Sequence, residues 1–306
     1  MYDFCGKFRE LSVYAGNRLM SVAHNGATLG VFTYDSHGNV INDGTKSLQY
    51  FYNLSNLPSL ICTVTGNSAQ GRIIYLWDGT KVLTQDESGN GRVYRGSFVY
   101  NLTSLEVAGV ESIAHDEGRF LAVQSELGTE FIDTWHVWDH LGSVRAVVDG
   151  LTGQTVETND YYPFGSRWED EDGISDPTNR YRFNGKEDQE GEFGVPTLDY
   201  GARHYTPSSA RWLSMDPLSE KYYGVSPYAF CNNDPVNFVD LDGRFVWAIP
   251  VVKLFAYGAG AAATMYAAQK LTKYESSKYN PGWDYQRQND RQGKEALDKE
   301  IGRAHV

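Results

Sequence analysis

Short segments in which apolar and polar residues alternate recur from about residue 12 to residue 165. Residues 92–95 and 144–147 are clear examples. Because successive side chains of a strand point to opposite faces, this alternation predicts antiparallel strands with one dry face and one solvated face. The first half of the chain is therefore expected to be a ladder of β-hairpins.

Turns rich in Asp, Asn and Gly separate these segments. A unit made of an aromatic residue, such a turn and a β-branched strand begins at Tyr34, Trp77 and Trp138, and a related turn spans residues 86–91. Glycine adopts positive φ without steric cost, and Asp bonds its own backbone. Isolated hairpins are marginal in water, whereas stacked hairpins pair their edges. The irregular spacing disfavours equal propeller blades and favours a long, curved antiparallel sheet.

The pattern changes twice further along the chain. An acidic, glycine-bearing loop at residues 168–178 leads into residues 180–244, which are dense in Tyr, Trp, Asn and Pro and predict a compact, irregular cap. Residues 245–269 are almost wholly apolar, and residues 270–306 are charged and helix-prone. We therefore expect a β-sheet region at 1–165, a cap at 166–244, and a tail at 245–306 with an apolar helix followed by a charged helix.

The apolar stretch at 245–269 has three interpretations. It exceeds the length of about 20 residues that a bilayer-spanning helix needs, so membrane contact is one of them. A helix packed inside a cavity of the protein is the second, and a helix that covers the core is the third. Lys253 and Pro250 lie within the stretch.

Composition narrows the function classes. The chain has 21 Tyr and 31 Gly but only 10 Pro, which favours aromatic strands joined by glycine turns. A net charge of −12 argues against a nucleic-acid partner, because phosphates require a basic face. The tail carries nine Lys and Arg against six Asp and Glu, so the negative charge belongs to residues 1–244.

The three cysteines have no CxxC spacing, so we predict neither a disulfide framework nor a metal site, and no cofactor. The first ten residues lack the pattern of a signal peptide, and the chain starts within the repeat pattern. We therefore expect it to be part of a longer protein.

A series of motifs resembles the C-terminal core of bacterial RHS/YD-repeat proteins. The resemblance covers about residues 15–244 and is most specific from residue 138 onward. The motifs are WDHLGSVR at 138–145, DYYPFG at 160–165, FNGKE at 183–187, LDYGARHY at 198–205, RWLSMDP at 211–217 and DLDGR at 240–244. Their details look like versions from Bacteroidetes-type bacteria.

This resemblance implies an all-β fold: a long curved antiparallel sheet of stacked hairpins forming part of an RHS shell, an irregular core cap and a short helical C-terminal tail. It implies a module of a polymorphic toxin, secreted or at the cell surface, that encloses its own C-terminal segment as cargo. The partners implied are the missing N-terminal repeats, an immunity protein and a target-cell surface.

The family also implies release of the enclosed segment by an aspartyl-protease-like pair of carboxylates. Asp216 and Asp240 match the two family motifs, Asp242 competes for the second role, and Arg211 could orient or tune them. Two adjacent carboxylates share a proton, so one can activate water while the other protonates the leaving amide. The cleavage point implied lies near the bond between Arg244 and Phe245.

Other interpretations stay open. These aspartates are also ordinary turn residues, and the chain departs from the family pattern at Leu241, Arg244 and Thr206, which leaves room for an inactive core. A cell-surface adhesin or carbohydrate-binding protein without catalytic activity is the alternative function, and it predicts solvent-facing aromatic residues. No nucleophile elbow or phosphate loop is present, so no activity on external substrates is expected.

Overall fold

Fifteen strands form one sheet, which we call the wall. The computed structural model describes residues 10–64, 69–125, 128–168, 174, 179–221, 223–244 and 246–248. The wall strands are β1 (Glu10–Ala15), β2 (Arg18–His24), β3 (Ala27–Tyr34), β4 (Val40–Asp43), β5 (Leu48–Tyr52), β6 (Pro58–Thr63), β7 (Ala69–Tyr75), β8 (Lys81–Gln85), β9 (Gly91–Arg95), β10 (Phe98–Thr103), β11 (Glu106–His115), β12 (Gly118–Ser125), β13 (Gly128–Trp138), β14 (Val144–Asp149) and β15 (Thr155–Thr158).

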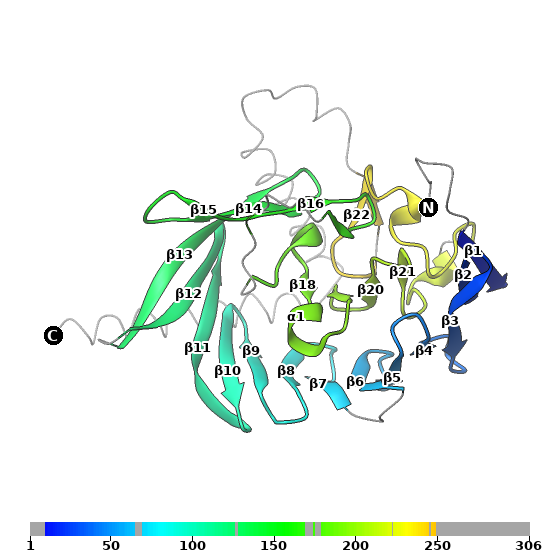
Figure 1. The fold of residues 1–306 in the computed structure, drawn as a ribbon, viewed down its shortest axis with the longest axis horizontal. Helices are drawn as coiled ribbons and strands as arrows, with labels where there is room; N and C mark the ends of the chain where they lie inside the picture. Colours follow the sequence, from blue (N-terminus) through cyan, green and yellow to red (C-terminus); the bar gives the residue numbers. More distant parts are fainter. Residues whose placement is uncertain are drawn as a thin grey trace.

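Each wall strand pairs antiparallel with its neighbours in the sequence, in the order β1 to β15. The wall bends around the remaining elements, which lie on its concave side (Figure 1). This architecture confirms the predicted fold class: an all-β chain built on one long, curved antiparallel sheet. Alternating residues give each strand a face for the interior, and the short turns keep successive strands adjacent.

A recurring turn closes many of the wall hairpins. In the turns that begin at Asp35, Asp86 and Asp139, the Asp Oδ1 accepts the N–H of the residue four positions further on. A glycine then adopts positive φ, as Gly38 does with φ +84°. The turn at Asn53 makes the same bond, with Asn56 in the place of glycine at φ +57°. The motif therefore needs an Asx side chain and a residue that tolerates positive φ.

Short elements make up the cap, described from residue 179 to residue 244, and the start of the tail. These are η1 (Phe183–Gly185), β18 (Glu187–Asp188), α1 (Glu190–Phe193), β19 (Leu198–Asp199), β20 (His204–Thr206), β21 (Arg211–Trp212), η2 (Ser219–Lys221), η3 (Cys231–Asn233), β22 (Phe238–Asp240) and β23 (Val246–Ala248). Strands β18 to β21 form a four-stranded sheet, and β22 pairs with β23. A hairpin of β16 (Asp160–Tyr161) and β17 (Arg167–Trp168) connects the wall to the cap.

The described residues form two hydrophobic cores, and the first of them joins the wall to the cap. In the first, aliphatic and tyrosine side chains of the concave wall face pack against the cap; its buried members are Leu19, Phe32, Val40, Leu48, Tyr50, Ile61, Ile73, Phe193, Val195 and Leu213. The second lies within the cap and consists of Phe183, Leu198, Tyr200, Tyr205, Trp212, Phe230 and Cys231. The cap is therefore an irregular, aromatic-rich body packed inside the bend of the wall.

The start of the apolar stretch differs from the prediction. Val246–Ala248 forms strand β23, which pairs with β22, whereas the sequence predicted a helix from Phe245. β-branched and aromatic residues at these positions suit a pleated surface beside an available strand edge. The remaining tail, with its predicted charged helix and membrane contact, lies outside the described residues. Within them, none of the helices has the length and apolar character needed to cross a bilayer.

Candidate functional site

Asp240 lies at the end of β22 and is fully buried. Its Oδ1 accepts the N–H of Gly243 at 2.7 Å and the N–H of Asp242 at 3.2 Å. Gly243 has φ +76°, so the chain turns sharply directly after β22. The turn chemistry that the sequence offers for this aspartate is thus present, and it leaves the second oxygen, Oδ2, for another partner.

Asp216 begins a turn that follows β21. Its Oδ1 accepts the N–H of Leu218 at 2.7 Å, and its backbone N–H donates to the carbonyl of Pro227 at 3.0 Å. Here too, one carboxylate oxygen stabilises the turn while Oδ2 points elsewhere. Its side chain keeps 15% of its surface exposed, so it is nearer to solvent than Asp240.

Arg203 brings the two aspartates together. Its Nη2 lies 3.3 Å from Asp216 Oδ2 and 3.1 Å from Asp240 Oδ2. The guanidinium is 1% exposed and lies 4.0 Å from the ring centroid of Trp212. A buried guanidinium between two carboxylates offsets part of their mutual repulsion, and the aromatic face adds a cation–π contact. The two positions that match the family motifs therefore share one cation.

The same guanidinium holds a peptide carbonyl. Arg203 Nε donates a hydrogen bond to the carbonyl oxygen of Gly243, and Nη1 donates to that of Pro227 at 3.4 Å. The carbonyl of Gly243 belongs to the peptide bond with Arg244. Arg203 therefore contacts both carboxylates and the carbonyl oxygen of Gly243 in the DLDGR motif. A donor at this place would stabilise negative charge that develops on that oxygen.

Burial shifts the proton equilibria of this cluster. It raises the pKa of Asp240 to about 6, against the opposing effect of Arg203. Burial also lowers the pKa of Arg203, although Asp240 and Asp216 favour its charged form. A carboxyl group with a pKa near 6 exchanges its proton close to neutral pH, which suits a general acid or base.

Lys186 is a further residue of the site that sequence reasoning missed. Its Nζ donates to the carbonyl of Leu241 at 2.5 Å and lies 5.0 Å from the ring centroid of Tyr200. Burial lowers its pKa, while Asp240 and Asp242 oppose that shift. The FNGKE motif could have indicated this lysine. It fixes the backbone of the segment that precedes Gly243.

The structure places the other two predicted residues differently. Asp242 accepts the N–H of Arg244 at 3.0 Å, as an ordinary turn residue does. Arg211 reaches the wall, where its Nη2 donates to the carbonyl of Asn17 at 2.5 Å and its guanidinium lies 5.3 Å from the ring centroid of Tyr14. The arginine on the two carboxylates is therefore Arg203, of the LDYGARHY motif.

A second cluster of buried charges joins the cap to the wall. Lys81 Nζ, on β8, lies 2.6 Å from Glu187 Oε2 and 2.6 Å from Asp199 Oδ2 of the cap. Arg180 and Tyr94 both donate to Glu187 Oε1, at 3.0 and 2.7 Å. Burial alone would raise the pKa of Glu187, but Lys81 and Arg180 lower it to about 2. These paired charges fix the position of the cap against the wall.

Comparisons with known proteins agree with this architecture. No family model matches the chain. The chain is 28% identical over 325 residues to the tRNA nuclease WapA of Bacillus subtilis (strain 168), which covers 86% of the chain and 14% of WapA. It is 26% identical over 211 residues to toxin subunit YenC2 of Yersinia entomophaga, which covers 61% of the chain and 21% of that subunit.

A solved structure of TcdB2-TccC3-Cdc42 is also similar. Its TM-score is 0.55 with 21% sequence identity, over 77% of this chain and 13% of that chain. The fold is that of an RHS shell. The relatives likewise support the RHS family that the motifs indicated. The chain spans 12% to 14% of the length of two WapA nucleases that it matches, so it corresponds to a small part of those proteins.

Proposed function

We propose that the chain is an encapsulation module, the part of an RHS shell that encloses its own C-terminal segment. The observation that carries this proposal is the wall wrapped around the cap (Figure 1). Arg203 binds the carbonyl of Gly243 immediately before the tail. The first core and the buried charges of Lys81 anchor the cap inside the bend. The segment from Arg244 onward, which begins with strand β23, is the enclosed cargo.

The remaining partners follow from the same proposal. Strand β1 pairs only with β2 among the described strands, so its other edge offers unpaired N–H and C=O groups. Preceding RHS repeats would continue the wall at this edge. We further propose a secreted or surface-associated toxin of bacterial competition, of the Bacteroidetes type, countered by an immunity protein and acting on a target-cell surface. No nucleic acid binds to the shell itself.

We also propose that the cap releases the tail by cleaving the peptide bond between Gly243 and Arg244. Arg203 polarises the Gly243 carbonyl, and Asp216, which is nearer to solvent, accepts a proton from water. The water oxygen bonds to the carbonyl carbon, the bond to the Arg244 nitrogen breaks, and protonated Asp240 supplies the proton to the departing amine. The contact with Arg203 favours this bond over its neighbour between Arg244 and Phe245.

The intact mass of the purified chain tests the release step. We expect the natural sequence to yield two fragments that meet at Gly243 and Arg244, and Asp216→Asn and Asp240→Asn to stay whole. Asp234→Asn is the matched control, because Asp234 also starts a turn before proline but bonds Asn237 rather than Arg203. An uncleaved natural chain would refute self-cleavage. Cleavage of Asp216→Asn and Asp240→Asn to the same extent as the natural chain would refute the roles of these two aspartates. Fragments that end at Arg244 and begin at Phe245 would instead show cleavage at the bond that the sequence indicated.

A further inference from the structure

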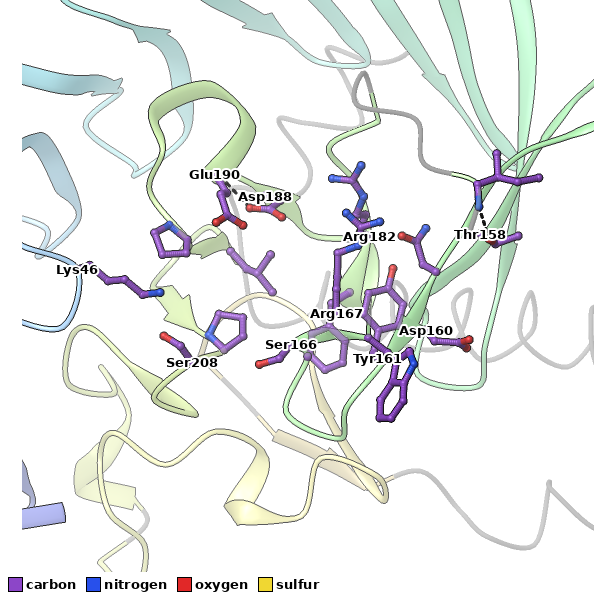
Figure 2. Close-up of a pocket in the computed structure, with 18 residues that line it drawn as sticks. Lys46, Thr158, Asp160, Tyr161, Ser166, Arg167, Arg182, Asp188, Glu190 and Ser208 are labelled. Carbon is purple, nitrogen blue, oxygen red and sulfur yellow. Dashed lines mark hydrogen bonds between the residues drawn. The ribbon is translucent and has the colours of Figure 1, made fainter. Parts of the chain in front are cut away.

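An open cavity of about 560 Å³ lies where the β16–β17 hairpin faces the four-stranded cap sheet. Figure 2 shows Lys46 reaching in from the wall, Asp188 and Glu190 on the cap side, and Arg167 and Tyr161 on the hairpin. The volume is within the range of about 300–1,000 Å³ that small-molecule sites occupy. None of the residues assigned to the release step lines this cavity.

Asn159, which lines the cavity, has an unpartnered amide. The residue is 4% exposed, yet neither its Oδ1 nor its Nδ2 has a hydrogen-bond partner among the residues that the structure describes. Its backbone is fixed, because its N–H donates to the carbonyl of Arg145 at 2.8 Å. Leaving a buried amide unsatisfied costs free energy, and a ligand that supplies one donor and one acceptor removes that cost. The amide therefore points to a polar ligand.

Two cations that line the cavity have no carboxylate at ion-pair distance among the described residues. Lys46 and Arg167 make no ion pair with any residue that the structure describes, whereas Arg182, also in the lining, is paired with Glu157. A guanidinium matches a carboxylate with two parallel hydrogen bonds, and an ammonium adds a point charge. Part of the ligand is therefore expected to be anionic.

The rest of the lining suits hydroxyl groups and a flat apolar face. Asp188 and Glu190 supply carboxylate acceptors, of which Asp188 Oδ1 already accepts the Glu190 N–H at 2.9 Å. Tyr161 and Trp168 add aromatic rings, and Trp168 is 53% exposed. Sugars combine hydroxyl donors with C–H faces that pack on aromatic rings. Repulsion from these carboxylates acts on any anionic ligand, but a sugar offsets it with hydroxyl donors, which a glutamate side chain and a phosphate dianion lack.

We propose that this cavity binds a saccharide that carries a carboxylate. Arg167 and Lys46 bind the carboxylate, Asn159 and Asp188 bind ring hydroxyls, and Trp168 packs on the sugar face. This site is separate from the release step, since none of the residues assigned to that step lines the cavity. It gives the shell a recognition function for acidic polysaccharides, such as those of a cell surface.

Titration calorimetry on the full chain tests this proposal with three probes of matched length. A galacturonic acid tetramer is expected to bind, while the galactose tetramer and a tetraglutamate peptide bind at least about tenfold more weakly. Absence of binding by the galacturonic acid tetramer overturns the proposal. Equal binding of galactose overturns the role of the carboxylate, and equal binding of the peptide shows a peptide site instead.

Variants locate the binding. Arg167→Gln and Trp168→Ala are each expected to raise the Kd for the galacturonic acid tetramer about tenfold or more, and Lys46→Gln by a smaller factor. Arg72→Gln and Trp77→Ala are the controls, because both residues are exposed on the wall and lie outside the lining. Equal weakening by the controls overturns the assignment. Asp240→Asn should leave this Kd unchanged, so loss of cleavage and loss of sugar binding are separate outcomes.

Discussion

The wall and the cap achieve burial by different means. In the wall, each strand pairs with its neighbours in sequence, and the residues on the concave face are mainly aliphatic or tyrosine. In the cap, strands of two or three residues are held by an aromatic cluster and by buried charges such as Glu187, Arg203 and Asp240. Alternation alone suffices for the first architecture, whereas the second requires particular pairs of side chains.

This difference predicts where single substitutions cost most. Lys81→Met should destabilise the protein by about 3–5 kcal/mol, because it leaves Glu187 and Asp199 buried without their shared cation. Arg145→Met is the matched control, since its ion pair with Asp160 is 40% and 57% exposed and should contribute at most about 1 kcal/mol. Urea unfolding followed by fluorescence measures both. Similar losses would contradict the view that buried pairs hold the cap.

The buried carboxyl groups of Glu187 and Asp240 predict opposite pH dependences of protein stability. The pKa of Glu187 falls from 4.5 to about 2 on folding, so its stabilisation is present above pH 4.5 and is lost as the pH falls toward 2. The pKa of Asp240 rises from 3.8 to about 6, so its proton stabilises the fold below pH 4 and this stabilisation is lost as the pH rises through 6.

Unfolding free energies of the natural chain, Glu187→Gln and Asp240→Asn between pH 2 and pH 7 test these signs. The advantage of the natural chain over Glu187→Gln should shrink in acid, while its advantage over Asp240→Asn should shrink toward neutral pH. Each change is on the order of 3 kcal/mol across its window. If the unfolding free energies of the two variants changed with pH in the same way, the opposite signs expected for Glu187 and Asp240 would be wrong.

Glycine substitutions in two wall turns distinguish the cost of backbone strain from the cost of a clash with the cap. Their effects on stability are the smallest that we expect. Gly142→Ala places a methyl group in open space at φ +81°, and we expect a loss of about 1–2 kcal/mol. Gly38→Ala has a similar φ, but its methyl group would lie 2.5 Å from Met215 Sδ and 2.7 Å from Tyr228 Oη. It should therefore cost more. Equal thermal unfolding midpoints for Gly38→Ala and Gly142→Ala would mean that the turn at Gly38 does not support the cap.

The sequence predicts the wall well because its signals are local. Alternation predicts the faces, and the Asp and Gly turns predict the hairpins; the turn at Asn53 was missed because Asn56 stands where glycine was sought. The strand at Val246–Ala248 was missed because apolar residues at a helix-length spacing conceal a short edge pairing.

The candidate site could be predicted only in part. Asp216 and Asp240 were found by resemblance, and the structure brings both onto Arg203. The arginine itself and Lys186 were not found, because cap contacts join residues far apart in the chain, such as Arg203 and Asp240. The periodicity of apolar residues along the chain does not indicate which distant residues form such pairs. Side-chain partners in an irregular body depend on tertiary packing, which a single sequence does not display.

The neighbour-to-neighbour order of the wall also has a consequence for how the protein is made. Pairing of consecutive strands keeps contact order low, so hairpins can form one after another as they leave the ribosome. Residues such as Glu187 meet Lys81 only after the sheet that carries Lys81 has been synthesised. Under the proposed encapsulation function, the wall is thus expected to form before the segment that it would enclose has been synthesised.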